Sequence, residues 1–129
     1  YVVIHNAIPG GLEYTITERL EMDPTKIKNL KLTGSINEVD YTFMRDKMTS
    51  LQSLNLKEVE SLIYGGYAIP ESAFSGKNTL SKCFLPEKLE RIEVGAFSGT
   101  ALTGSRILPG GLKYGSGFND TKITNVHFP

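Results

Sequence analysis

The sequence has few of the residues from which metal sites and disulfides are built. Its 129 residues include one cysteine, Cys83, and two histidines, His5 and His127. A single cysteine excludes an intrachain disulfide and any zinc site that needs several cysteines. The two histidines lie far apart and neither belongs to a metal-ligand spacing such as H-x-x-x-H, so we expect both to be structural or exposed. No cofactor or metal is predicted.

Net charge is lacking as well. Fourteen Lys and Arg residues balance fourteen Asp and Glu residues, which gives a formal charge of zero. A neutral chain has no overall field to attract nucleic acid or an anionic membrane surface, so neither is a predicted partner. No apolar run approaches the ~20 residues that a membrane-spanning helix needs. The composition, 40% hydrophobic and 22% charged, is ordinary for a single globular domain of this length.

Motifs that carry catalysis are also missing. The three Gly-Gly pairs lack the lysine and Ser/Thr of a phosphate-binding loop. Cys83 would need a lowered pKa and a basic partner to act as a nucleophile, and its place in the repeat described below predicts a core position instead. The glutamates at 87, 90 and 93 alternate with basic residues, which is typical of a solvated face. The sequence therefore predicts a protein that is not an enzyme.

The chain does contain an internal repeat. Ala-Phe-Ser-Gly occurs at 73–76 and again at 96–99, and a third phenylalanine follows as Phe118, so the three phenylalanines are 23 and then 21 residues apart. Each is followed five or six positions later by an aliphatic residue, and then by an apolar residue directly before a proline. Markers that recur together at one spacing predict a repeat of about 22 residues.

The apolar pattern L-x-x-L-x-L recurs in the same frame. It occurs at 27–32, 51–56 and 123–128, and at 80–85 if Cys83 takes the middle apolar position. Its last two apolar residues are two apart, so on a strand they share one face. Such strands bury their apolar faces only by stacking on one another. We therefore predict an α/β fold: a repeat solenoid with one parallel β-sheet and short return segments on its other side.

Residues 1–25 do not follow the repeat and are expected to form an N-terminal cap over its open end. The first four residues could form a short strand. Leu12, Ile16 and Leu20 lie four apart, which predicts a short helix with one apolar stripe, and Pro24 follows as its stop.

A second helix is expected from about Asp40 to Met48, with Asp40 as its N-cap. The prediction is thus a single domain over residues 1–129, with about five repeats in 26–129. The chain begins with tyrosine rather than methionine, as expected of a processed chain or a piece of one. It ends directly after an expected strand, so we expect either a longer array or self-association of two copies through that C-terminal edge.

Two stretches of the sequence carry a family resemblance. The stretch IPESAFSGKNTLSKCFLPEKLERIEVGAFSG resembles the BspA-like leucine-rich repeats of surface and secreted proteins from Bacteroides-type bacteria. The stretch KIKNLKLTGSINEVDYTFMRDKMTSLQSLNL is similar to the region that commonly precedes such arrays. The resemblance covers residues 26–129. It implies a leucine-rich-repeat solenoid, an extracellular or cell-surface location, and an adhesive role toward a host or bacterial surface protein.

The expected function is a non-catalytic protein-binding module. The alternative is a structural spacer or scaffold that positions a neighbouring domain. A binder should concentrate aromatic residues and arginine on the outward face of the sheet, whereas a spacer needs only solubility there. The residue between the last two apolar positions of each pattern points outward, and these candidate binding residues are Lys31, Asn55, Phe84, Arg106 and His127.

The position of Arg106 depends on the register of its repeat. The stretch before Pro109 holds one residue more than the other repeats. Arg106 faces outward if Ser105 and Ile107 face inward. If the repeat is instead aligned on Pro109, Arg106 faces the core. Burying an unpaired guanidinium costs several kcal/mol. We therefore favour the outward position, with a bulge near Leu108.

Overall fold

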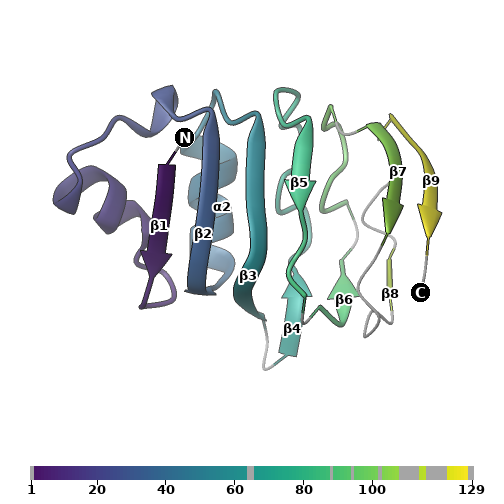
Figure 1. Cartoon of the computed structure of the whole chain (residues 1–129), viewed down its shortest axis with the longest axis horizontal. Coiled ribbons are helices and arrows are strands. Elements are labelled where there is room, and N and C mark those ends of the chain that lie inside the picture. Colours follow the sequence, from purple (N-terminus) through teal and green to yellow (C-terminus); the bar gives the residue numbers. More distant parts are fainter. Residues whose placement is uncertain are drawn as a thin grey trace.

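The centre of the fold is a parallel sheet of four strands, shown in Figure 1. In pairing order the strands are β1 (Val2–Asn6), β2 (Asn29–Ile36), β3 (Ser53–Ile63) and β5 (Lys82–Phe84). Two helices accompany it, α1 (Leu12–Tyr14) and α2 (Glu38–Lys47), and α2 lies behind the sheet at β2 and β3 (Figure 1). The predicted α/β class with a parallel sheet is confirmed.

This computed structural model describes residues 2–63, 66–87, 89–93, 95–101, 103–107, 114–115 and 122–127. It describes side chains for 2–61, 63, 66–87, 89–93 and 95–101.

Five further strands and two short helical turns complete the described elements. They are a π-helical turn η1 (Thr15–Arg19), a 3-10 turn η2 (Pro24–Lys26), β4 (Gly66–Ile69), β6 (Arg91–Ile92), β7 (Thr103–Ile107), β8 (Tyr114–Gly115) and β9 (Lys122–His127). β4 turns back antiparallel on the end of β3, and β7 and β9 pair with each other in parallel. β4, β6 and β8 form a second parallel ladder in which every pair joins residues 23 positions apart, such as Ala68 with Arg91 and Arg91 with Tyr114. This spacing is that of the predicted repeat.

The apolar residues of the repeat pattern form the core. Eight of them are at most 4% exposed: Ile27, Leu30, Leu32, Leu51, Leu54, Leu56, Leu80 and Cys83. Leu85, the last apolar position of its pattern, is only partly buried. The predicted inward register is therefore confirmed for the described patterns up to Cys83.

Two of the three repeat phenylalanines, Phe74 and Phe97, are core residues, as predicted, and Phe118 lies outside the described residues. Phe74 and Phe97 are fully buried, and their rings stack with centroids 5.5 Å apart. Tyr41 of α2 meets Phe74 edge-on at 5.6 Å. The return segments are also joined through their main chains, because the Phe74 N–H donates to the Ala96 carbonyl at 2.7 Å. Corresponding residues of successive repeats thus lie side by side behind the sheet.

Helix α2 begins two residues before the predicted start. Asn37 is its N-cap, and the Asn37 side chain accepts a hydrogen bond from the Val39 N–H at 3.0 Å. The expectation that Asp40 caps this helix is wrong. Asp40 sits at the third helical position, where its carboxylate accepts from the Asn37 N–H at 3.2 Å to complete a capping box.

The buried carboxylate of Asp40 ties the N-terminal residues to α2. Asp40 is 1% exposed. Its Oδ2 accepts from the Gly10 N–H at 2.8 Å and from the Asn6 side-chain amide at 3.2 Å, and its Oδ1 accepts from the Leu12 N–H at 3.0 Å. Four N–H donors, including that of Asn37, therefore converge on one side chain. Sequence patterns do not reveal this, because three of the donors lie 28 or more positions away.

The predicted N-terminal helix is interrupted by a π-turn. Leu12 and Ile16 are fully buried, as predicted, but Leu20 is 47% exposed. The Leu20 N–H donates to the Thr15 carbonyl, five residues back. This wider turn breaks the four-residue spacing, which explains why Leu20 leaves the apolar stripe.

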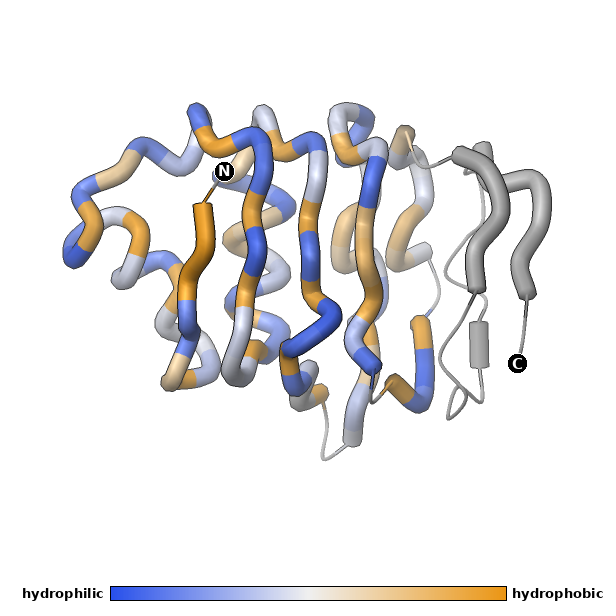
Figure 2. The backbone as a smooth tube through the Cα atoms, viewed as in Figure 1, coloured by the Kyte–Doolittle hydropathy of each residue, from blue (hydrophilic) through white to orange (hydrophobic). Residues whose placement is uncertain are grey.

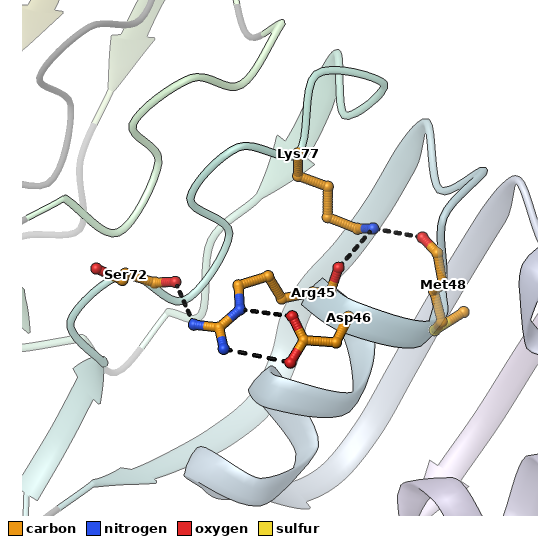
Figure 3. A network of polar contacts seen from close by, with 5 residues as sticks. All are labelled: Arg45, Asp46, Met48, Ser72 and Lys77. Carbon is orange, nitrogen blue, oxygen red and sulfur yellow. Dashed lines mark hydrogen bonds and ion pairs between the residues drawn. The ribbon is translucent and has the colours of Figure 1, made fainter.

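A buried lysine joins the first return segment to the C-terminal end of α2 (Figure 3). Lys77 is 5% exposed, and its ammonium donates to the main-chain carbonyls of Met48 and, at 3.3 Å, Arg45. Arg45 in turn donates to the Ser72 carbonyl at 3.1 Å while it pairs with Asp46 at 2.9 Å. Desolvation lowers the pKa of Lys77. A cation at this end satisfies carbonyls that the helix leaves unpaired.

Gly34 on β2 provides a test of how closely β1 packs on that strand. Its φ is +91°, and an added Cβ would lie 2.3 Å from the Asn6 carbonyl oxygen. We expect Gly34→Ala to lower the free energy of unfolding by about 2 kcal/mol, measured by chemical denaturation, because backbone strain and a main-chain clash combine. Gly76→Ala is the matched control, since its φ is +77° and no atom lies within 4 Å. Equal losses in the two variants would show that the close contact with β1 contributes nothing.

Candidate functional site

Three of the candidate binding residues, Lys31, Asn55 and Phe84, lie on the outward face of the parallel sheet. Apolar and polar residues alternate along β2 and β3 (Figure 2). Pairing places Val3, Lys31, Asn55 and Phe84 in one row across β1, β2, β3 and β5. Paired residues of neighbouring strands share a face, and their sequence neighbours Leu30, Leu54 and Cys83 are buried on the other one. The structure thus brings together three of the five predicted residues.

Val3 is a member of this row that the sequence analysis missed. It is 59% exposed and pairs directly with Lys31. The apolar run Val2–Ile4 is compatible with a strand, but residues 1–25 do not carry the repeat pattern that located the other members. Only its pairing with β2 shows which residue stands beside Lys31.

Phe84 differs from the other phenylalanines whose side chains are described. It is 47% exposed, whereas Phe43, Phe74 and Phe97 are 6% exposed or less. Its row neighbour is the polar Asn55. An exposed aromatic ring on a sheet face is a residue type that concentrates binding energy in protein interfaces.

A bulge in β3 shapes the middle of the face. Lys31 pairs with Asn55, but the next outward residue of β2, Thr33, pairs with Glu58, so β3 has one extra residue. The Asn55 side chain closes the bulge by accepting from the Lys57 N–H at 3.0 Å. Lys31 reaches across to Glu58 in an ion pair of 2.9 Å. At the bulge, the side-chain oxygen of Asn55 is thus occupied by a main-chain hydrogen bond, and the charge of Lys31 is balanced by Glu58.

His5 belongs to the next row of the same face, where it pairs with Thr33. Its Nδ1 lies 2.9 Å from the Thr33 hydroxyl, and the residue is exposed. Within the described residues, no group of three His, Cys, Asp or Glu side chains could hold a metal ion. His5 is therefore exposed, one of the two alternatives, structural or exposed, that the sequence predicted.

The side chains of Arg106 and His127 lie outside those that the structure describes. Their main chains belong to β7 and β9, where Arg106 pairs with Val126 and His127 pairs with Ile107. The two predicted residues are therefore one position out of register rather than in one row. The shift in the pairing falls between Gly104 and Ser105, where β9 holds an extra residue, whereas Leu108, the expected bulge position, is outside the described residues.

Two of the three glutamates after β5 are engaged in local contacts. Glu93 pairs with the Arg91 guanidinium at 2.8 Å. Glu90 accepts a hydrogen bond from the Tyr67 N–H at 3.3 Å, which links two successive repeats. Glu87 is exposed, as predicted for all three. Glu90 and Glu93 thus have structural roles that the charge alternation alone did not indicate.

The hydroxyl groups of Tyr41 and Ser61 form a buried pair 2.7 Å apart. Both residues are at most 1% exposed. Burial raises the pKa of Tyr41, and its hydrogen bond with Ser61 opposes this effect only in part. Ser61 also donates to the Ala68 carbonyl of β4. The pair therefore joins α2, β3 and β4 inside the core.

Cys83 is fully buried and forms no disulfide. We expect its thiol to resist alkylating reagents in the native protein and to react only after unfolding. Cys83→Ser should lower the free energy of unfolding by about 1–3 kcal/mol, because it places a hydroxyl in an apolar site. Ser81→Cys on the exposed neighbouring position is the control and should react quickly in the folded protein. Rapid native labelling of Cys83 would contradict the inward register.

Among the residues that the structure describes, none of the helices is both long and apolar enough to cross a bilayer. No protein-family model matches the chain, and no curated protein is significantly similar to it.

Proposed function

We propose that the chain is a leucine-rich-repeat solenoid of the BspA-like kind whose outward sheet face binds a protein ligand at the cell surface or after secretion. The repeat spacing supports the solenoid, because β4, β6 and β8 pair at 23-residue intervals and two return segments are joined by main-chain hydrogen bonds. A regular stack of this kind presents an extended surface for ligands.

The observation that carries the binding proposal is the row Val3, Lys31, Asn55 and Phe84. Its two ends are apolar and exposed, at 59% for Val3 and 47% for Phe84, and its centre is polar. Protein interfaces combine aromatic and other apolar contacts with hydrogen-bonding groups, and this row supplies both kinds.

The size of this row sets the expected affinity. Parallel strands stand about 4.8 Å apart, so four strands span only about 14 Å. A stable protein interface needs ~800 Å² from each partner. This surface alone therefore binds weakly, and further repeats or several copies would raise the apparent affinity.

The test is a binding assay against immobilised host-matrix and bacterial surface proteins. Phe84→Ser should reduce retention about fivefold or more, because an exposed aromatic anchor is lost. Leu20→Ser is the matched control, since Leu20 is also 47% exposed but lies after η1 and outside the sheet. Arg106→Ala tests whether β7 contributes to the same surface.

The outcomes of this assay separate the two candidate functions. Loss of binding in Phe84→Ser, with Leu20→Ser unchanged and both variants folded, supports the outward face as the binding surface. Equal binding by both folded variants moves the site away from this face. If the wild-type protein retains no ligand from either panel, a structural spacer becomes the better proposal.

A further inference from the structure

A second surface feature lies on α2, on the side of the sheet opposite the binding row. A groove with a cavity volume of about 310 Å³ opens where α1 contacts α2. Its lining includes Glu13 of α1 and Glu38, Val39, Phe43, Asp46 and Lys47 of α2. This volume is at the lower end of the range for ligand sites, enough for one or two inserted side chains.

The floor of the groove is apolar. Val39 is 55% exposed, and Phe43, four residues further along the helix, is 6% exposed. Residues four apart lie on one side of a helix. The other side of α2 is already used, since Tyr41 and Met44 are buried at 1% or less. Val39 is β-branched, which slightly disfavours a helix, and more than half of its surface is exposed.

The end of the groove near the start of α2 is anionic. Glu13 and Glu38 are exposed, and neither forms an ion pair with any residue that the structure describes. Asp46, in contrast, does form an ion pair: its carboxylate lies 2.9 Å from the Arg45 guanidinium. Lys47 lies nine positions after Glu38, about 13 Å along the helix axis. Two carboxylates without an ion pair among the described residues therefore adjoin the apolar floor at one end.

We propose that this groove receives an arginine or lysine side chain of a protein partner. The methylene stem packs on Val39 and Phe43, and the cationic head pairs with Glu13 and Glu38. Long basic side chains combine an apolar stem with a charged tip, which matches the two parts of the groove. Arginine fits best because its planar guanidinium can contact two carboxylates at once. The proposal is independent of the outward sheet face.

The test uses the ¹⁵N-labelled chain and two short synthetic peptides. One peptide carries arginine flanked by leucines, and the other carries glutamate in place of each arginine. We expect the arginine peptide to shift the amide signals of Glu38, Val39 and Phe43, and the shifts to diminish at high salt. The glutamate peptide should leave these signals unchanged.

Variants identify the side chains involved. The double variant Glu13→Gln and Glu38→Gln should weaken the arginine peptide about fivefold or more. Val39→Ser should also weaken it without altering any charge. Glu58→Gln, which neutralises an exposed carboxylate on the sheet face, should have no effect. Both glutamates occupy first helical turns, where negative charge stabilises a helix, so thermal melts must first show that the double variant is folded.

Three results would overturn the proposal. One is the absence of amide shifts on α2 with the arginine peptide. Another is equal shifts with both peptides, which would indicate contact through leucine alone. The third is unchanged affinity in the folded double variant. Phe84→Ser separates this proposal from the proposed function, because it should reduce ligand retention on the sheet face about fivefold or more and leave the arginine-peptide titration unchanged.

Discussion

Replacing Asp40 by alanine is expected to lower the free energy of unfolding by about 3–4 kcal/mol, measured by chemical denaturation. The carboxylate accepts hydrogen bonds from three main-chain N–H groups and one side-chain amide, and it is 1% exposed. Removing it leaves these donors without their acceptor in a place that water does not readily reach. The main consequence should be the release of the first twelve residues from α2.

Two further substitutions separate this role from a general effect of charge. Asp46→Ala removes a carboxylate of the same helix that is exposed and pairs with Arg45, and it should cost less than about 1 kcal/mol. Asp40→Asn keeps the size of the side chain but turns one acceptor into a donor that faces other donors, so it should remain strongly destabilising. A small loss in both Asp40 variants would mean that the N-terminal residues contribute little to stability.

Replacing Phe74 by alanine should cost about 3–5 kcal/mol, because it opens a cavity between two other aromatic rings. Phe74 is fully buried and contacts the rings of Tyr41 and Phe97. The substitution therefore removes the ring contacts that connect Tyr41 of α2 to Phe97 of the next return segment. Chemical denaturation measures this loss of unfolding free energy directly. A lower dependence of that free energy on denaturant concentration would show in addition that the remaining structure unfolds less cooperatively.

Phe84→Ala removes the same atoms from the sheet face and is the matched control. Because Phe84 is 47% exposed, this change should cost less than about 1 kcal/mol. Comparable losses for Phe74 and Phe84 would contradict the assignment of one to the core and the other to the surface. The small expected effect is also what makes Phe84 variants suitable for binding assays.

The outward face and the α2 groove would serve different contacts. On the face, the charge of Lys31 is balanced by an ion pair with Glu58. The groove combines an apolar floor with the carboxylates of Glu13 and Glu38. Because α2 lies behind the sheet (Figure 1), a ligand on the face leaves the groove open.

The inward positions of the repeat could be predicted from the sequence because strand alternation is a local property. In a strand, residues two apart share a face wherever the strand is placed. Leu54 and Leu56 are thus both buried, and Asn55 between them is outward. The same rule placed Cys83 in the core and Phe84 on the surface. The buried phenylalanines followed from their recurrence at the repeat spacing.

The neighbours of each residue, in contrast, were decided only by the tertiary structure. The partners of Asp40 lie up to 34 positions away, so its burial at the third position of α2 depends on how residues 6–12 fold over that helix. The same holds for Lys77, whose ammonium meets carbonyls 29 and 32 positions earlier. A polar residue shows its chemistry in the sequence, but the groups that satisfy it are a matter of packing.

Register between strands also required the tertiary structure. The sequence by itself determined the repeat spacing, the inward positions of the described patterns up to Cys83, and the outward positions of Lys31, Asn55 and Phe84. It did not determine the bulge that pairs Thr33 with Glu58, the addition of Val3 to the row, or the offset between Arg106 and His127. Alternation along a strand fixes which side a residue faces, whereas its neighbour across the sheet depends on hydrogen bonds between distant segments, and one extra residue changes every pair that follows.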